Sequence, residues 1–283
     1  MLRHLAIALF ALLAACVSAP PDRDTTLQVM TFNIRLNLAS DGPNAWPHRK
    51  DAVANLIRSA DLVGLQEALP EQLADLDALI PHFGRIGAGR AADRRGEASA
   101  ILYRRDRFEV LRQETFWLSE TPDVAGSKGW DAAYERIATW GEFRDRTTGV
   151  RFFHFNTHLD HVGAMARREG TRLLLRAIAR IAAPEDAVML TGDFNAPPDS
   201  APYRQVIDAG FEDAFHRSRR PHEGPDSTWN GFKAIEPGRR IDFIFVRNAV
   251  EVLRHEIADT MMEGGRFPSD HLPVMAELRI RRR

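Results

Sequence analysis

Acidic, amide and imidazole side chains follow apolar, strand-like segments at several separate points of the sequence. The positions are Asn33, Glu67, Asp193 with Asn195, Asp242, and Asp270 with His271. A single Asp or Asn at such a place usually forms a turn, but several strand ends can bring their side chains together at one cleft. Oxygen ligands beside imidazoles suit Mg²⁺ or Mn²⁺ better than a structural zinc. The pattern therefore predicts a divalent-metal site.

The hydrophobic pattern predicts the strands and helices that must position these side chains. Strands are predicted over 27–34, 62–65, 98–103, 108–118, 137–143, 152–157, 187–191, 241–246, 250–257 and 272–280. Helices are predicted over 49–59, 71–79, 164–181 and 203–209. Little helix separates the four strands between 98 and 157, which favours antiparallel pairing among them. No linker or repeat divides the chain, so we expect one domain over 27–283, with two packed sheets and helices outside.

The composition is that of a folded globular protein. The 283 residues include 38 Lys and Arg against 39 Asp and Glu, and 44% of them are hydrophobic, which excludes a disordered chain. The formal net charge of −1 provides no field to steer the whole molecule onto a nucleic acid. Three arginines in one predicted loop (Arg90, Arg94 and Arg95) could still form a local basic track.

The N-terminal residues have the pattern of an export signal. Arg3 precedes an apolar run over 5–17, which is shorter than the roughly 20 residues of a membrane-spanning helix. The run ends in Leu13-Ala14-Ala15-Cys16, which resembles the lipobox of bacterial lipoproteins. We therefore expect a signal peptide over 1–15, and a lipidated Cys16 that begins a tether over 16–26. The lipid would anchor the protein in the bacterial envelope, on the periplasmic side of the outer membrane. The alternative is a simple secretory signal.

Seven short motifs occur in order along the remaining chain. They are Thr31-Phe32-Asn33-Ile34-Arg35, Leu65-Gln66-Glu67, the segment 96–103, Asn156-Thr157-His158-Leu159-Asp160, Gly192-Asp193-Phe194-Asn195, Arg240-Ile241-Asp242-Phe243-Ile244 and Ser269-Asp270-His271-Leu272-Pro273-Val274. Together they resemble the endonuclease/exonuclease/phosphatase family, which has the deoxyribonuclease I-like fold. The resemblance implies an α/β protein, a four-layer αββα sandwich of two mixed, mostly antiparallel sheets with helices outside.

The resemblance also implies the parts of a metal-dependent hydrolytic site. Glu67 would hold the divalent metal, with Asn33 and Asp270 completing or orienting its oxygen ligands. Asp193 would accept a proton from the attacking water, and Asn195 would position that water or a phosphate oxygen. The metal, Mg²⁺ or alternatively Mn²⁺, would act as a Lewis acid and as a template for in-line displacement.

Two imidazoles complete the implied site. His271 would stabilise charge on the phosphoryl oxygens, and Asp242 would hold that imidazole in its donor form. His158 would contact the phosphate or the leaving group, with support from Glu97.

Two further residues are predicted to bind substrate. Arg136 could clamp a phosphate with two parallel hydrogen bonds, although an arginine at an exposed strand edge is an equal alternative. Asp160 lies in a predicted loop before the long helix, where it could touch the substrate.

These observations predict a monomeric, divalent-metal-dependent phosphoester hydrolase, with a phosphodiesterase, including a nuclease, as the leading interpretation. A phosphomonoesterase acting on a phosphosugar, an inositol or a lipid head group is the alternative within the same fold, because one site chemistry serves many substrates. The alternative from another class is a non-catalytic binding module displayed on the envelope.

Overall fold

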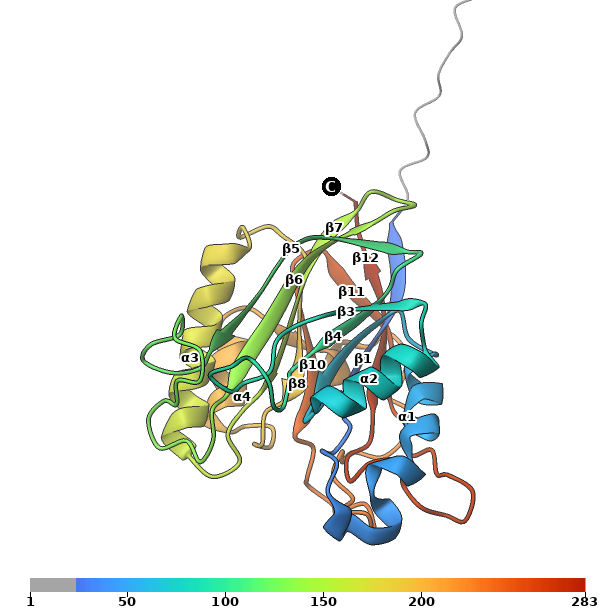
Figure 1. Ribbon diagram of the computed structural model, residues 1–283. Coiled ribbons are helices and arrows are strands. Elements are labelled where there is room, and N and C mark those ends of the chain that lie inside the picture. The colour runs from blue at the N-terminus through green and yellow to red at the C-terminus, as the bar shows by residue number, and fades with distance from the viewer. Residues whose placement is uncertain (1–23, 283) are drawn as a thin grey trace, which may run out of the picture.

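Two mixed β-sheets of six strands pack face to face in the computed structural model, which describes residues 24–282 (Figure 1). The first sheet contains, in spatial order, β11 (Val250–Ile257), β12 (Val274–Ile280), β1 (Thr25–Asn33), β2 (Leu62–Gln66), β4 (Ile101–Arg104) and β3 (Phe83–Ile86). The second contains β5 (Phe108–Trp117), β6 (Ile137–Asp145), β7 (Arg151–His158), β8 (Val188–Asp193), β10 (Asp242–Arg247) and β9 (Glu212–Asp213). Only β1–β2 and β7–β8 pair in parallel among the described strands.

Helices cover the outer face of each sheet (Figure 1). The first sheet carries α1 (Lys50–Ile57) and α2 (Pro70–Leu79), and the second carries α3 (Ala164–Ile181) and α4 (Ala201–Asp208). Shorter elements are α5 (Ala214–Arg217) and the 3₁₀ helices η1 (Ala39–Asn44) and η2 (Trp46–His48). The predicted four-layer αββα sandwich is confirmed.

Alternation of side chains along the strands creates three apolar cores. In β1, Leu27 and Val29 face the other sheet, where they share a core with Met189 of β8. The intervening residues Met30 and Phe32 face the helices and share a second core with α1 and α2. A third core joins α3 and α4 to the second sheet. Each fully buried aliphatic or aromatic side chain contributes about 1.5–3 kcal/mol, so the helices are held mainly by these cores.

The inward-facing positions change from apolar to polar toward one end of the sandwich. In β1, the series that begins with Leu27 continues through Thr31 to Asn33, and in β8 Met189 is followed by Thr191 and Asp193. Because every second residue of a strand faces the same side, the apolar core between the sheets is followed along the strands by a cluster of polar side chains.

Hydrogen bonds satisfy this polar part of the core. Gln66 donates to Thr31 Oγ1 at 3.0 Å and to Asn156 Oδ1 at 2.8 Å, which links the two sheets. Gly64 lies beside this bridge, and a Cβ atom there would stand 2.4 Å from Thr191 Oγ1. The sheets approach closely at this point, so the polar strand ends of both sheets meet.

The predicted element order is largely observed, with two informative differences. Strand β3, which contains a glycine and an exposed arginine, was not predicted because its four residues carry almost no apolar alternation. Strand β4 pairs with β2 and β3 and not with β5, so the predicted antiparallel series holds only for β5, β6 and β7. A local pattern does not specify which of two sheets a strand joins.

The expectations for the N-terminal residues lie outside the described part of the chain. This applies to the signal peptide over 1–15, to Cys16 and to most of the tether over 16–26. Within residues 24–282, no helix has both the length and the apolar character that crossing a bilayer requires.

Candidate active site

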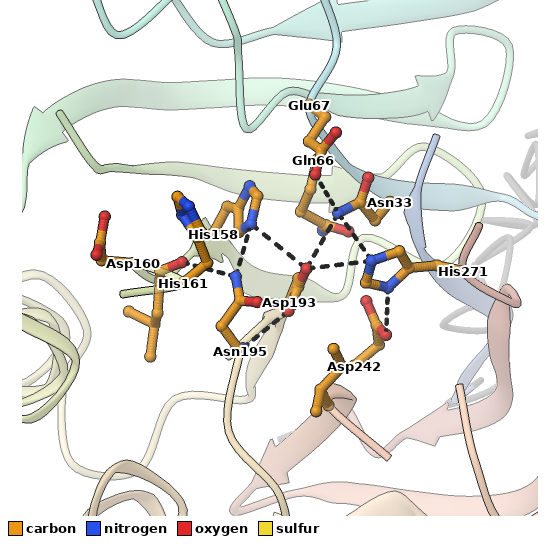
Figure 2. A network of polar contacts seen from close by, with 12 residues as sticks. Asn33, Gln66, Glu67, His158, Asp160, His161, Asp193, Asn195, Asp242 and His271 are labelled. Carbon is orange, nitrogen blue, oxygen red and sulfur yellow. Dashed lines mark hydrogen bonds and ion pairs between the residues drawn. The ribbon is translucent and has the colours of Figure 1, made fainter. Parts of the chain in front are cut away.

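A cavity of about 530 Å³ opens where the polar strand ends of both sheets meet. Its wall contains carboxylates, imidazoles, arginines and aromatic rings, namely Arg35, Leu36, Leu38, Glu67, Arg90, Glu97, Tyr134, Arg136, His158, His161, Asp193, Asn195, Trp229, Asp270 and His271. Two predicted site residues, Asn33 and Asp242, lie directly behind this wall and contact it through His271 and Asp193 (Figure 2).

Asn33 connects the two halves of the site. Its Nδ2 donates to Glu67 Oε1 and to Asp193 Oδ2, both at 3.0 Å. Glu67 follows β2 of the first sheet and Asp193 ends β8 of the second, so a single amide ties the sheets together at the site (Figure 2). Glu67 Oε2 also accepts from the Leu36 backbone at 3.0 Å. These bonds orient both carboxylates before any ligand binds.

Three residues of the site have a left-handed backbone conformation that is uncommon outside glycine. Their φ values are 53° at Arg35, 60° at Glu67 and 47° at Asn195. Each lies directly after a strand or two residues beyond it, where the chain turns sharply to present its side chain to the cavity. Such conformations cost free energy and concentrate at functional sites, so they support a functional role for this cavity.

Asp193 is a fully buried carboxyl of the cavity wall. Burial and the neighbouring charge of Asp242 together raise its pKa to about 7, against the opposing effect of His271. Within residues 24–282, two N–H groups donate to its carboxylate, those of Asn195 at 2.8 Å and Asn33 at 3.0 Å. A carboxylate with a pKa near neutrality can accept a proton from water efficiently.

His271 and Asp242 form a buried imidazole–carboxylate pair. His271 Nδ1 lies 2.9 Å from Asp242 Oδ2, and its Nε2 faces Asp193 Oδ2 at 3.7 Å. Burial disfavours the imidazolium, but Asp242 and Asp193 outweigh that effect and raise the pKa of His271 to about 10. His271 therefore carries a positive charge at neutral pH, held within reach of the cavity.

His158 has the opposite electrostatic setting. Burial lowers its pKa well below the ordinary value, and Arg136 and His271 lower it further. Its Nε2 accepts from Asn195 Nδ2 at 2.9 Å and lies 3.4 Å from Asp193 Oδ2. The two imidazoles of the site thus differ in charge at neutral pH, and His158 is neutral.

The donor set fits a divalent cation. Burial raises the pKa of Asp270, and the nearby charge of Glu67 raises it further, so these two carboxyls repel each other unless a cation lies between them. Ligand atoms of Asp193, Asp242 and His271 also lie within 4.8 Å of one another, but a protonated His271 cannot bind a cation, so this cluster is not the proposed metal site. Among the described residues, Asp242 Oδ1 is buried without a hydrogen-bond partner. Oxygen donors of this kind match the preference of Mg²⁺ and Mn²⁺.

Glu97 lines the cavity, but its ion pair is with Arg90 and not with His158. The reason is local, because the Arg90 backbone N–H donates to the Glu97 carbonyl at 2.9 Å and brings the two side chains together. The prediction that Glu97 supports His158 is therefore wrong, because Glu97 pairs with Arg90 instead. Burial raises the pKa of Glu97, and Arg90 opposes that effect.

Asp160 was predicted to touch substrate, but its carboxylate is turned away from Asp193 (Figure 2). It is buried and accepts hydrogen bonds from five N–H groups, those of Ala133, Tyr134, Arg136, Val162 and Gly163. Its contact with the cavity runs through Arg136, which donates to Oδ2 at 3.2 Å. Arg136 is itself buried and lines the cavity, so the alternative of an exposed strand-edge arginine is wrong.

Several residues of the cavity wall are not indicated by the sequence analysis, among them Arg35 and Tyr134. Arg35 lies two residues after Asn33, and its ion pairs are with Asp41 at 3.1 Å and Asp270 at 3.7 Å. Tyr134 has no strand periodicity because it lies in the loop before β6. A spacing of two from Asn33 would have indicated Arg35, but nothing in the local sequence indicates Tyr134.

Comparison with known proteins agrees with this geometry. The family model for the endonuclease/exonuclease/phosphatase family matches residues 30–271. The chain belongs to that family, and its fold is the phosphoesterase fold that the family shares. No curated protein has a significantly similar sequence.

Several solved structures are similar over most of their length. An endonuclease/exonuclease/phosphatase from Bacteroides vulgatus is 40% identical, with a TM-score of 0.86 and coverage of 90% of this chain and 99% of that one. A mannosyl-6-phosphatase from Bacteroides thetaiotaomicron is 34% identical, with a TM-score of 0.83 and coverage of 89% and 99%. TDP2 from D. rerio, in complex with a single-strand DNA product, is 20% identical, with a TM-score of 0.69 and coverage of 90% and 99%; this similarity shows the fold alone.

Proposed function

We propose that the protein is a divalent-metal-dependent phosphoester hydrolase. The observation that carries the proposal is the position of Asp193, a carboxyl with a pKa near 7 that lies between a cationic and a neutral imidazole in one cavity. This combination provides a base for water and a positive charge for the phosphoryl oxygens. A non-catalytic binding module would have no need of so costly an arrangement of buried charges.

The side chains divide the reaction among them. Asp193 accepts the proton of the attacking water, and Asn195, whose backbone N–H donates to Asp193 Oδ1, positions that water or a phosphate oxygen. The imidazolium of His271, oriented by Asp242, stabilises negative charge on the phosphoryl group. Neutral His158 contacts the phosphate or the leaving group. Removal of one such electrostatic contact typically costs about 10²–10³ in rate.

Glu67 and Asp270, with Asn33 orienting Glu67, would hold the metal ion, and Mg²⁺ or Mn²⁺ suits these oxygen donors. A bound cation would supply Lewis acidity to a phosphoryl oxygen and neutralise the repulsion between the two carboxylates. Asn33 and Asp193 keep the base close to this position through the 3.0 Å hydrogen bond between them.

A phosphodiester remains the leading substrate in this proposal, and a phosphomonoester on a sugar is a second candidate. The second candidate is supported by the 34% identity to a protein described as a mannosyl-6-phosphatase. The cavity of about 530 Å³ has the size of a small-molecule site, which is consistent with a small phosphoester of either kind.

A hydrolysis screen of the purified protein tests the function. It should span nucleic acids, dinucleotides, phosphosugars and phospholipid head groups, each with Mg²⁺, with Mn²⁺ and with EDTA, and with Asp193→Asn as the matched control. We expect metal-dependent release of product by the wild type, and release that is slower by a factor of about 10²–10⁴ by the variant. Activity that persists in EDTA, or an unchanged rate in Asp193→Asn, would contradict the proposal. A binding module would give no turnover, and calorimetry would then detect no metal binding.

We also propose that a lipid on Cys16 anchors a monomeric enzyme on the periplasmic side of the outer membrane. The support is the lipobox-like Leu13-Ala14-Ala15-Cys16 sequence. Incorporation of radiolabelled palmitate in cells, compared between the wild type and Cys16→Ala, tests the modification, and membrane fractionation tests the location. Equal labelling of the two proteins would refute the anchor without affecting the enzymatic proposal.

A further inference from the structure

The wall of the active-site cavity carries a stacked pair of aromatic side chains that the proposed reaction does not use, Tyr134 and His161. Both line the same cavity as His158 and Asp193. Their rings stack with centroids 5.8 Å apart and an interplanar angle of 16°. Tyr134 nevertheless keeps 51% of its surface exposed. Aromatic surface is therefore available to a ligand inside the cavity where the phosphoester must lie.

Charged neighbours hold both rings in place. The Arg90 guanidinium lies 5.0 Å from the centroid of the Tyr134 ring, and Arg136 Nη2 lies 2.9 Å from His161 Nδ1. The Tyr134 backbone N–H donates to Asp160 Oδ2 at 3.4 Å, which fixes the loop beneath the ring. Since both rings are already held in one conformation, little side-chain conformational entropy is lost when a ligand packs against them.

Arg136 also determines which nitrogen of His161 carries the hydrogen. A guanidinium can only donate hydrogen bonds, so Nδ1 of His161 accepts and the ring keeps its hydrogen on Nε2. His161 therefore adds an N–H donor to the aromatic surface, and the guanidinium of Arg90, which pairs with Glu97, lies over the Tyr134 ring. Flat aromatic surface next to fixed N–H donors is suited to a ring that carries hydroxyl groups.

Two exposed apolar side chains come shortly after His161 in the sequence. Val162 and Met165, which follow His161 in the sequence, are 63% and 48% exposed. Their segment is tied to the loop that carries Tyr134, because Asp131 Oδ1 accepts from the Ala166 backbone at 2.6 Å. The start of α3 is therefore held against the loop that carries Tyr134.

We propose that Tyr134 and His161 bind the alcohol part of the substrate, and that this part is a hydroxyl-bearing ring, as in a phosphosugar or a nucleotide. The inference rests on the proposed hydrolase function and adds the class of leaving group to it. An acyclic alcohol such as glycerol has no flat face to place against the rings, so it gains little from them. Tyr134 acts on substrate binding and takes no part in the proton transfers.

Steady-state kinetics on the full chain test this inference. The substrates are mannose 6-phosphate, AMP, a linear dinucleotide and glycerol 3-phosphate, each with Mg²⁺ and with Mn²⁺. Tyr134→Ala should raise KM for the preferred ring-bearing substrate about tenfold, the usual effect of losing one stacking contact, and leave kcat within about twofold. Tyr134→Phe keeps the ring and should retain the KM of the wild type. Ile207→Ala removes an exposed aliphatic side chain on α4, outside the cavity wall, and should change neither constant.

The outcomes separate this inference from the function on which it rests. A wild-type KM in Tyr134→Ala for every ring-bearing substrate, or a higher kcat/KM for glycerol 3-phosphate than for all of them, would overturn the inference and leave the hydrolase function standing. Failure of the wild type to hydrolyse any of the three ring-bearing substrates, with activity on a phospholipid head group in the wider screen, would overturn the inference alone, and failure on every substrate of both sets with either metal would overturn both. The substrate on which Tyr134→Ala acts most strongly distinguishes a sugar from a nucleotide. Circular dichroism of each variant shows whether the fold is intact.

Discussion

Asp193 and Asp160 are two buried aspartates near the ends of the neighbouring strands β8 and β7, and their surroundings shift their pKa values in opposite directions. Burial raises the pKa of both. At Asp160, hydrogen bonds from the Gly163, Ala133 and Val162 backbones outweigh burial and lower the pKa to about 2. At Asp193, the added charge of Asp242 acts in the same direction as burial, and the pKa rises to about 7.

The number of N–H donors therefore separates a structural carboxylate from a reactive one. The Asp160 carboxylate accepts hydrogen bonds from five N–H groups, which occupy its acceptor sites and hold two loops and Arg136 in place. Asp193 receives two and keeps acceptor capacity for water. Burial alone would have suggested the same role for both residues.

The largest expected effect is on catalysis at Asp193. Asp193→Asn keeps the shape of the side chain but removes the base, so kcat should fall by about 10²–10⁴ on any hydrolysed phosphoester. Steady-state assays measure this loss. Asp160→Asn is the matched substitution at the structural carboxylate, and its kcat should fall less. An equal loss in both variants would remove the functional distinction between the two residues.

The next effect is on stability at Asp160. Asp160→Ala leaves Arg136 buried without its carboxylate, and breaking such a pair should lower the free energy of unfolding by about 3–5 kcal/mol. Urea denaturation measures the change. Asp193→Asn should act in the opposite direction above pH 7 in metal-free buffer. The folded-state pKa of Asp193 lies above its unfolded value, so its buried charge opposes folding there. If both Asp160→Ala and Asp193→Asn lowered the free energy of unfolding above pH 7, or both raised it, the difference drawn between the two carboxylates would be wrong.

A smaller loss is expected at Asp242. Asp242→Asn removes the carboxylate that orients His271 and favours its cation, so the pKa of His271 should fall from about 10. Loss of an orienting partner of this kind typically lowers activity about 10–100-fold. NMR titration of the histidine resonances measures the pKa, and assays measure the rate. An unchanged His271 pKa would show that Asp193 alone maintains the cation.

The smallest effect concerns acid stability. The folded-state pKa of Asp160, about 2, lies below its unfolded value, so the stability that the carboxylate contributes is present above about pH 4 and is lost as the pH falls toward 2. The difference in free energy of unfolding between the wild type and Asp160→Asn should therefore shrink over that interval. Chemical denaturation at a series of pH values measures it. A difference that stays constant below pH 4 would contradict the low pKa.

The local sequence predicted most of the fold because the strands and helices are encoded by their own periodicity. Alternation in β1 and the apolar stripe of α3 are visible without any partner, since each element must bury one face. The sequence does not predict strand β3, because a short segment such as Phe83–Ile86 becomes a strand only through its pairing with β4. Sheet membership of β4 was missed for the same reason, since it depends on contacts made far along the chain.

Residue types and their order along the sequence determined the family, the chemistry of the donor set and the strand ends that would carry it. Tertiary structure alone decided which donors reach each side chain. In the tertiary structure Glu97 forms an ion pair with Arg90, Asp160 accepts hydrogen bonds from five N–H groups, and the Tyr134 ring stacks on His161 in the cavity wall. The physical reason is that pKa values and side-chain contacts depend on atoms within a few ångströms, which here come from loops and strands distant in sequence.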